Sequence, residues 1–356
     1  LSSLIHNKEN PNEVDVHDSI SGNLCRCTGY RPILDAARRA ALTPWRAKPD
    51  AAGLKALRRE KTFAYADAGQ KFFAPRNVDQ LAALLAEYPR ATLLAGGTDV
   101  GLWVTKHHQH LPVIIYTHHV PELHRLEKTE AGVEIGAAVP YADAFAALAA
   151  YDESMEELLR RLGSAQIRNS GTVGGNIANG SPIGDGMPPL IALGARLTLR
   201  SVAGVREMAL EDYFIGYKKQ NREAGEFVEK ITVPPLRATT LFKTYKVSKR
   251  FDQDISAVCA AFALEVKDGK IASARIAYGG MAAIPKRAAL AEKSLIGKAW
   301  GAPAAQNAMR ALADDFAPLT DMRASKEYRA TVAVNLLWRF YLETNGLQRQ
   351  RVYGHG

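Results

Sequence analysis

A glycine-dense segment at residues 171–185, GTVGGNIANGSPIGD, constrains this chain more than any other feature. Glycine lets the backbone adopt positive φ and approach a ligand closely, and consecutive backbone N–H groups in such a segment form an anion-binding concavity. Asp185 is suited to accept hydrogen bonds from sugar hydroxyls, and short polar side chains stand at Thr172, Asn176, Asn179 and Ser181. The segment has almost no periodicity, so we predict a long loop, either ligand-binding or an ordinary surface loop.

A second glycine segment, residues 93–101, reads LLAGGTDVG. It predicts a strand that ends in a glycine turn, where phosphates are usually held. Adjacent Gly96 and Gly97 do not match the Gly-x-Gly-x-x-Gly dinucleotide fingerprint, and no Gly-Lys-Ser/Thr phosphate loop is present. Each segment alone is weak support, but two in one domain favour a large diphosphate ligand.

From residue 71 the pattern alternates between strands and helices, which predicts an α+β fold. Asn77 caps a helix with Gln80 three residues later, and Asp268-Gly269 predicts a two-residue hairpin turn between strands at 257–266 and 271–278. Met155, Leu158, Leu159 and Leu162 form one helical stripe. We predict further strands at 92–95, 113–116, 133–136, 196–199 and 227–233, and further helices near 304–314 and 325–343.

The first residues, to about 47, read as helical, with Pro32 in the first turn of one helix. Residues 43–70 lack clear apolar periodicity and look like a linker. Cys25 and Cys27 form an unusual i, i+2 pair, whereas Cys259 lies in an apolar run and is predicted to be a small buried hydrophobe. Three cysteines cannot form a disulfide framework, which fits a reducing cytosol and predicts a cytoplasmic protein.

The formal net charge of +9 raises nucleic-acid or membrane binding as hypotheses. The basic residues are scattered, however, and no apolar run is long enough to span a bilayer, so we expect neither partner. His107, His108 and His110 lack the spacing of a zinc site and are interpreted as a surface loop. A cofactor or substrate rich in negative charge explains the positive charge better.

Four strings, in this order, resemble the molybdenum hydroxylases, and most closely the small iron–sulfur/FAD subunit of bacterial xanthine dehydrogenases. They are GNLCRCTGYRPI at 22–33, the two glycine segments, and KVSKRFDQDI at 246–255. The resemblance implies an α+β chain of three parts. Residues 1–47 would be the helical C-terminal part of a [2Fe-2S] domain, 48–70 a linker, 71–236 a two-subdomain FAD-binding domain, and 237–350 an α+β C-terminal flavoprotein domain.

The resemblance also implies site residues. The FAD pyrophosphate would lie against residues 93–100, that is Leu93, Leu94, Ala95, Gly96, Gly97, Thr98, Asp99 and Val100. A second wall would come from Thr172, Gly175, Asn176 and Asn179, with Asp185 on a ribose or ribityl hydroxyl. Leu162 and Val228 would pack on the flavin or adenine ring, although core packing explains both as well. Lys246 would stand near the flavin, and residues 250–254 would line the approach of NAD+.

Cys25 and Cys27 would be two ligands of a [2Fe-2S] cluster, which normally needs four. The family's other cysteine pair would precede Leu1, so the chain resembles an N-terminally truncated fragment. By this resemblance it passes electrons from iron–sulfur clusters and a molybdenum partner through FAD to NAD+, during hydroxylation of xanthine or hypoxanthine. No catalytic side chain is implied, because the flavin carries the chemistry. A molybdopterin-binding large subunit would complete a heterotetramer or larger assembly.

Three alternatives remain at this point. The chain could be the flavoprotein subunit of a related aldehyde, CO or N-heterocycle hydroxylase, because the hydroxylated substrate would bind elsewhere. It could be a scaffold that holds FAD but is inactive alone. A basic nucleotide- or RNA-binding protein without a redox role is the third.

Overall fold

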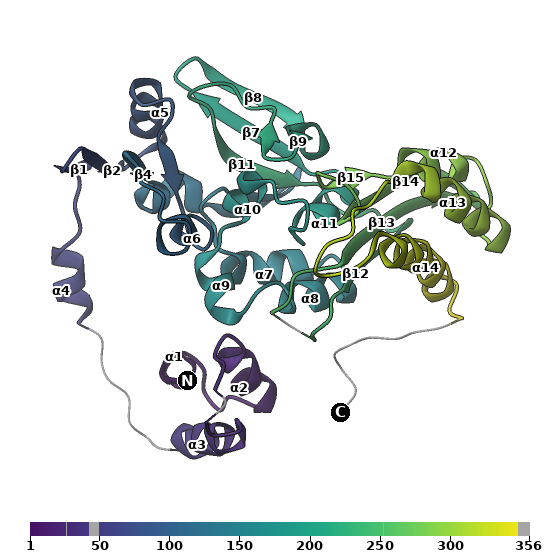
Figure 1. Ribbon diagram of the computed structural model, residues 1–356, viewed down its shortest axis with the longest axis horizontal. Helices are drawn as coiled ribbons and strands as arrows, with labels where there is room; N and C mark the ends of the chain where they lie inside the picture. Colours follow the sequence, from purple (N-terminus) through teal and green to yellow (C-terminus); the bar gives the residue numbers. More distant parts are fainter. Residues whose placement is uncertain (26, 43–49, 252, 348–356) are drawn as a thin grey trace.

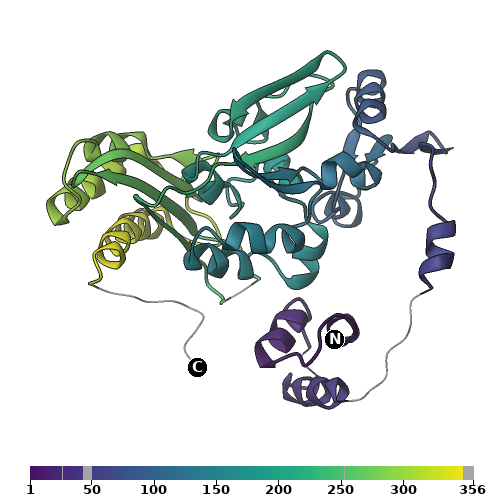
Figure 2. The same ribbon diagram turned by 180° about the vertical axis from the view of Figure 1, so that it is seen from behind.

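The computed structural model describes residues 1–25, 27–42, 50–251 and 253–347. Arg26, Asp252, the ends of the predicted first and last domains (43–47 and 348–350) and the first two residues of the predicted linker therefore lie outside the described residues. Figure 1 shows N-terminal helices below a central body, which continues into a C-terminal sheet covered by helices. The same arrangement is visible from behind in Figure 2. The predicted α+β class is confirmed.

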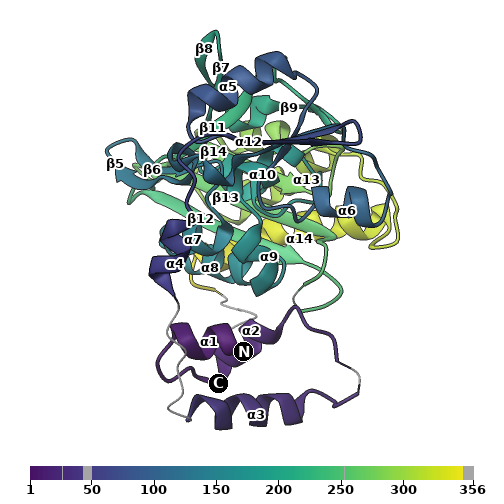
Figure 3. The ribbon, with the colours of Figure 1, turned by 90° about the vertical axis from the view of Figure 1, so that its left-hand side faces the viewer.

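The N-terminal helices are α1 (Ser2–Asn7), α2 (Glu13–Ile20) and α3 (Arg31–Ala41), followed by α4 (Ala51–Ala56). α2 begins with a capping box, because the Asn12 side chain accepts from the Asp15 backbone and the Asp15 carboxylate accepts from the Asn12 backbone. Pro32 lies in the first turn of α3, as predicted. Figure 3 shows α1–α3 as a separate layer beside α8 and α9.

The first part of the central body is built on a four-stranded sheet with the order β1-β2-β4-β3. β1 and β2 form an antiparallel hairpin, and β2, β4 and β3 run parallel. Leu81 and Leu85 of α5 pack on Ile115 in a small core. The elements are β1 (Phe63–Asp67), β2 (Gln70–Ala74), α5 (Val78–Glu87), β3 (Thr92–Leu94), α6 (Val100–Thr105) and β4 (Val113–Tyr116), then 3₁₀ turns at Thr117–His119 and Pro121–His124.

The second part has a five-stranded antiparallel sheet with the order β5-β6-β11-β7-β8 and a separate core. Its strands are β5 (Leu126–Thr129), β6 (Gly132–Gly136), β7 (Arg196–Ser201), β8 (Gly204–Ala209) and β11 (Phe227–Val233), with a small pair β9 (Phe214–Gly216) and β10 (Lys219–Gln220) after a 3₁₀ turn at Leu210–Tyr213. Its helices are α7 (Tyr141–Ala149), α8 (Glu153–Arg160), α9 (Ala165–Ser170), α10 (Val173–Asn179) and α11 (Met187–Ala192).

The C-terminal part is a four-stranded antiparallel sheet, β12-β13-β14-β15, with α12–α14 packed against it (Figure 1). The predicted Asp268-Gly269 turn is confirmed: both residues have positive φ, 49° and 72°, as a type I′ turn requires. The elements are β12 (Thr240–Val247), β13 (Val258–Lys267), β14 (Lys270–Gly279), β15 (Lys286–Arg287), α12 (Ala289–Leu295), α13 (Ala302–Asp315) and α14 (Lys326–Thr344).

Two sequence expectations differ from the structure. The segment predicted as a linker contains α4, capped by the Asp50 side chain, and strand β1, which pairs with β2 around Ala68 and Gly69. The prediction of an irregular loop over 171–185 is wrong for its first half. There the Thr172 hydroxyl caps α10, and Gly180 ends it with a left-handed φ of 62°.

Among the described residues, no helix combines the length and the apolar character needed to cross a membrane.

Candidate functional site: a cavity between two glycine segments

A cavity of about 1010 Å³ lies where the two parts of the central body meet. One wall is the turn after β3, and the other is α10 with the residues before and after it. Both glycine segments therefore face the same space, although about 70 residues separate them in the chain. Clefts between subdomains commonly bind cofactors, and this one is large enough for an extended ligand.

The turn after β3 presents free backbone donors to the cavity. Gly96, Gly97 and Thr98 all line it. No acceptor among the described residues takes a hydrogen bond from the backbone N–H groups of these three residues. Gly97 has a φ of +71°, a conformation that turns successive N–H groups toward one side. Free N–H groups around a concavity form an anion site, so this turn fits a phosphate or diphosphate.

The backbone of Ser170, on the other wall of the cavity, leaves room only for glycine at position 96. A Cβ at this position would lie 1.8 Å from the carbonyl oxygen of Ser170, at the end of α9. Only glycine permits that approach, because backbone atoms on both sides leave no room to move. The close packing of the two glycine segments thus sets the position of the donors at 96–98.

The wall formed by α10 contributes side chains rather than free backbone donors. The N–H groups of Val173 and Gly174 donate to the carbonyls of Val139 and Ala137, at 3.0 and 3.2 Å, and the Gly175 N–H donates to the Thr172 hydroxyl at 2.9 Å. These groups are therefore not available to an anion. The expected backbone concavity is located in the first segment, not at the start of the second.

Asn176 is oriented by a buried tyrosine. The Tyr141 hydroxyl donates to Asn176 Oδ1 at 2.8 Å, and burial raises the tyrosine pKa far above its ordinary value. With its oxygen occupied, Asn176 presents the amide NH₂ as a donor. Because Asn176 and Tyr141 both line the cavity, this pair supplies a fixed polar contact opposite the turn.

Most of the residues expected at the site do line this cavity. They are Leu93, Ala95, Gly96, Gly97, Thr98, Asp99, Val100, Leu162, Thr172, Gly175, Asn176, Asn179 and Val228. Leu94, Asp185 and Lys246 lie outside its lining. Leu162 was expected on a helical stripe, but α8 ends at Arg160, so its partly buried side chain reaches the cavity instead.

Asp185 and Lys246 form a buried ion pair. Their side chains are 8% and 1% exposed, and Lys246 Nζ donates to Asp185 Oδ2 and to the Asp254 carbonyl, the latter at 2.8 Å. The Ser256 hydroxyl donates to the other carboxylate oxygen at 2.5 Å. This arrangement joins the start of α11 to β12 and to the segment after it. In this structure Asp185 is held by Lys246 and Ser256 rather than directed at the cavity.

Cys259 lies beside this ion pair. It is fully buried, and burial raises the pKa of its thiol well above the ordinary value. The expectation of a small buried hydrophobe is confirmed.

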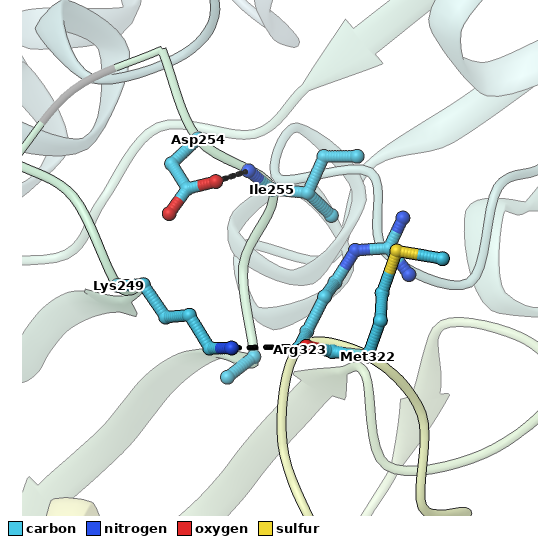
Figure 4. A pocket seen from close by; sticks show the side chains of 6 residues that line it. Lys249, Asp254, Ile255, Met322 and Arg323 are labelled. Carbon is cyan, nitrogen blue, oxygen red and sulfur yellow. Dashed lines mark hydrogen bonds between the residues drawn. The ribbon is translucent and has the colours of Figure 1, made fainter.

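In the segment after β12, Lys249, Asp254 and Ile255 line a small second pocket of about 220 Å³, together with Ala257, Met322 and Arg323. Figure 4 shows Lys249, Asp254 and Ile255 facing Met322 and Arg323 across it. Lys249 Nζ donates to the Met322 carbonyl at 2.9 Å, and the Asp254 carboxylate accepts from the Ile255 N–H at 3.0 Å. The expected approach for NAD+, 250–254, is part of this segment.

Arg161 fastens this segment to the central body. Its buried guanidinium donates to the carbonyls of Phe251 and Lys246 at 2.8 and 2.9 Å and to the Ser248 hydroxyl at 3.3 Å. The next residue, Leu162, lines the large cavity. Because Arg161 and Leu162 are adjacent in the chain, they connect the cavity wall with residues 246–251.

Replacing Arg161 with methionine is expected to loosen residues 246–251. Two carbonyls and one hydroxyl would lose a charged donor, at a cost of about 2–4 kcal/mol. Hydrogen exchange of the 246–251 amides and denaturant unfolding measure this effect. Arg196→Met is the control, because Arg196 forms an exposed surface pair with Glu207. Unchanged exchange in Arg161→Met would show that other contacts hold the segment.

Several cavity residues were missed by the sequence reasoning. Lys218 and Arg222 come from the β9–β10 region, which carried no recognised motif, and Asp99 is the single carboxylate among the described lining residues. The lining thus has an excess of positive charge, which suits a diphosphate. The signal available in the sequence was the aromatic and basic run 213–222, YFIGYKKQNR. Other missed lining residues include Trp103, His107, Tyr141, Ile167, Tyr213, Tyr217, Gln220 and Phe227.

If the cavity holds a flavin, as the family resemblance implies, replacing Gly175 with valine is expected to yield protein without bound flavin. A Cβ here would lie 2.7 Å from the Thr172 hydroxyl that caps α10, and the branched side chain would occupy cavity space. Absorbance of the purified protein measures flavin content. Gly301→Val is the control, because Gly301 has an extended backbone and an open neighbourhood outside the cavity. Normal flavin stoichiometry in Gly175→Val would refute the proposed wall.

The cysteine pair lies far from this cavity in the chain. Cys25 is partly buried and Cys27 is exposed. A hydrogen bond from the Thr28 hydroxyl lowers the pKa of the Cys25 thiol. No group of three or more metal-ligating side chains occurs within the ranges that the structure describes. The two thiols alone provide half of the ligands that a [2Fe-2S] cluster normally uses.

Three known families match consecutive parts of the chain. Residues 1–38 match a [2Fe-2S] binding domain, residues 65–236 the FAD binding domain in molybdopterin dehydrogenase, and residues 243–344 the CO dehydrogenase flavoprotein C-terminal domain. The middle match contains both cavity walls. The chain therefore carries an FAD-binding domain, preceded by residues that match a [2Fe-2S] binding domain and followed by a flavoprotein C-terminal domain.

The proteins that are similar to this chain include several different enzymes. Xanthine dehydrogenase 1 of Arabidopsis thaliana is 28% identical over 96% of this chain, and aldehyde oxidase 2 of Mus musculus is 26% identical over 96%. The chain spans only 31% and 30% of the lengths of these relatives. A solved carbon monoxide dehydrogenase from Hydrogenophaga pseudoflava aligns with a TM-score of 0.72 and 27% identity, covering 77% of this chain and 96% of the other. The fold is thus that of molybdenum hydroxylase flavoproteins.

Proposed function

We propose that this chain, which has the fold of the molybdenum hydroxylase flavoproteins, binds FAD between its two glycine segments and forms the electron-transferring flavin part of an oxidoreductase. The observation that carries the proposal is the set of free N–H groups at Gly96, Gly97 and Thr98, which line a cavity inside the FAD-binding domain. The positive lining residues Lys218 and Arg222 support a diphosphate there.

The proposed contacts divide by ligand group. The pyrophosphate would accept hydrogen bonds from the N–H groups at 96–98, and the Asn176 amide would donate from the opposite wall. Leu162 and Val228 would pack against a ring. The remaining wall residues would be Leu93, Ala95, Asp99, Val100, Thr172, Gly175 and Asn179, with Leu94 supporting them from the strand.

Asp185 and Lys246 would act on the flavin from behind the cavity wall. Lys246 would contribute positive charge, and Asp185 would hold it in place or exchange partners with a cofactor hydroxyl. Bound FAD would accept single electrons from iron–sulfur centres and deliver two as a hydride to NAD+. The protein's own contribution is to orient the ring and to set the electrostatics around it.

For the complete enzyme we propose a xanthine dehydrogenase-type reaction with NAD+ as acceptor and xanthine or hypoxanthine as substrate. The support is the similarity to xanthine dehydrogenases along 96% of the chain. The solved carbon monoxide dehydrogenase favours the alternative that the chain serves another molybdenum hydroxylase. We also propose a cytoplasmic assembly, a heterotetramer or larger, with a molybdopterin-binding subunit, in which Cys25 and Cys27 are cluster ligands.

NADH titration of the purified, FAD-loaded chain tests the proposal. We expect the oxidised-flavin absorbance to bleach when NADH is added without oxygen. A bound flavin that NADH leaves unchanged would favour an FAD-holding scaffold. A colourless protein that retains no added FAD would contradict both hypotheses.

A further inference from the structure

One acidic residue of the N-terminal helices forms ion pairs with the central body. Asp18 of α2 lies 3.5 Å from Arg160 Nη1 and 3.5 Å from Arg168 Nη2. Beside it, Gln166 Nε2 donates to the Ser19 carbonyl at 3.2 Å. Figure 3 shows the α1–α3 layer next to α9, the helix that carries Gln166 and Arg168. The interface therefore has a charged centre formed by two arginines of the central body.

The arginine side of this interface is preorganised. Arg168 is 8% exposed, and its Nη1 donates to the carbonyl of Arg160 at 2.8 Å. Among the described residues, Asp18 is the only carboxylate in ion-pair contact with Arg168. Arg160 has a second partner, Glu156, within its own helix. The N-terminal helices thus supply the counter-ion of a nearly buried cation in the central body.

The two surfaces also fit sterically. A Cβ on Gly22, just after α2, would lie 2.0 Å from Gln166 Oε1 and 2.9 Å from the hydroxyl of Ser164, which caps α9. Gly22 therefore permits the close contact, while Asp18 provides its charge. Within the described ranges, the side chain of Asp18 forms ion pairs and hydrogen bonds only with Arg160 and Arg168, across the interface.

α9 is shared between this interface and the cavity. Its Gln166 and Arg168 contact the N-terminal helices, and its Ile167 lines the cavity. Its last residue, Ser170, lies against Gly96 in the turn after β3. A short helix thus separates the segment carrying Cys25 and Cys27 from the proposed flavin site, and contacts both.

We propose that Asp18 is the positioning residue that docks the iron–sulfur segment on the flavin domain, with Arg160 and Arg168 as its receptor. Docking would fix the separation of the two redox sites through α9. The docking itself needs no cofactor, whereas its role in electron transfer rests on the proposed function.

Small-angle scattering of the whole chain tests the docking. In Asp18→Lys a cation would face two arginines, so we expect a larger radius of gyration at low salt than in the unmodified chain. Asp18→Glu keeps the charge and should restore the compact value. Asp35→Lys is the matched control, because Asp35 is an exposed acid in α3 that pairs with Arg38 outside the interface. Equal expansion in both lysine variants, or none in Asp18→Lys, would overturn the proposal.

The rates of flavin and iron–sulfur reduction distinguish a positioning role of Asp18 from a purely stabilising one. In protein that carries assembled iron–sulfur centres, NADH should reduce the flavin of Asp18→Lys at the normal rate, while reduction of the iron–sulfur centres slows, because undocking increases the distance between the two redox sites. Normal iron–sulfur reduction in an undocked variant would overturn the positioning role. If NADH fails to reduce even the unmodified flavin, the proposed function fails, and the scattering result still decides the docking.

Discussion

Replacing Gly96 with alanine is expected to abolish FAD retention. The new Cβ would lie 1.8 Å from the Ser170 carbonyl oxygen and 2.5 Å from its carbon, both backbone atoms. The turn would have to move, and the N–H groups of Gly96, Gly97 and Thr98 would move with it. Loss of these donors should weaken FAD binding at least about 100-fold, which corresponds to roughly 3 kcal/mol.

FAD titration followed by flavin fluorescence measures this loss. The matched control is Gly101→Ala, which changes the same segment where a Cβ would meet no atom within 4 Å. Circular dichroism of both variants establishes that the protein is folded. If Gly96→Ala binds FAD as tightly as Gly101→Ala, the turn after β3 is not the phosphate site.

Replacing Lys246 with methionine is expected to destabilise the protein by about 3–5 kcal/mol, because the buried Asp185 carboxylate would lose its counter-ion. Removing both partners, as in Lys246→Met with Asp185→Leu, should recover much of this loss, because no unpaired charge remains. Denaturant unfolding of the three proteins measures the difference. A single variant within about 1 kcal/mol of the unmodified chain would contradict the ion pair's structural role.

Lys243→Met is the control on the same strand. Lys243 pairs with Asp152 at 2.7 Å, but both side chains are about one-fifth exposed, so the loss should be nearer 1 kcal/mol. Because Lys246 does not line the cavity, the folded fraction of Lys246→Met should still retain FAD. A changed flavin potential in that fraction would support the proposed electrostatic role of Lys246, and an unchanged potential would count against it.

Local rules in the sequence predicted much of the fold. Asn77 caps α5 by accepting from the Gln80 N–H at 2.8 Å, as its spacing with Gln80 predicted. The Asp268-Gly269 turn has the positive φ values that its residue types predicted. These features depend on neighbours a few residues apart, so the sequence carries them directly.

For the second glycine segment, the prediction from local sequence was wrong. Glycine density over 171–185 predicted an irregular loop, since glycine disfavours helices. The structure forms α10 there, because the Thr172 cap and packing of Val173 and Ile177 in the core outweigh that cost. Glycine at 174 is required by a neighbour distant in sequence: a Cβ would lie 2.5 Å from Ala137.

Site residues that belong to one continuous segment were predicted from the sequence. Site residues that depend on contacts between distant segments were missed. Residues 95–100 line the cavity as expected. Lys246 and Asp185 are 61 residues apart, and no local pattern reveals that they pair with each other. Lys218 and Arg222 reach the cavity from the turn of a small β-hairpin and from the residues after it, and the position of this hairpin follows only from the packed sheet.

The proposed function requires that this chain binds FAD in the cavity between its glycine segments. Equilibrium dialysis of the purified chain against FAD, with Gly96→Ala in parallel, tests the claim most directly. We expect saturation at one FAD per chain and no retention by Gly96→Ala. A chain that takes up no FAD, or a Gly96→Ala variant that takes up a full equivalent, would contradict it.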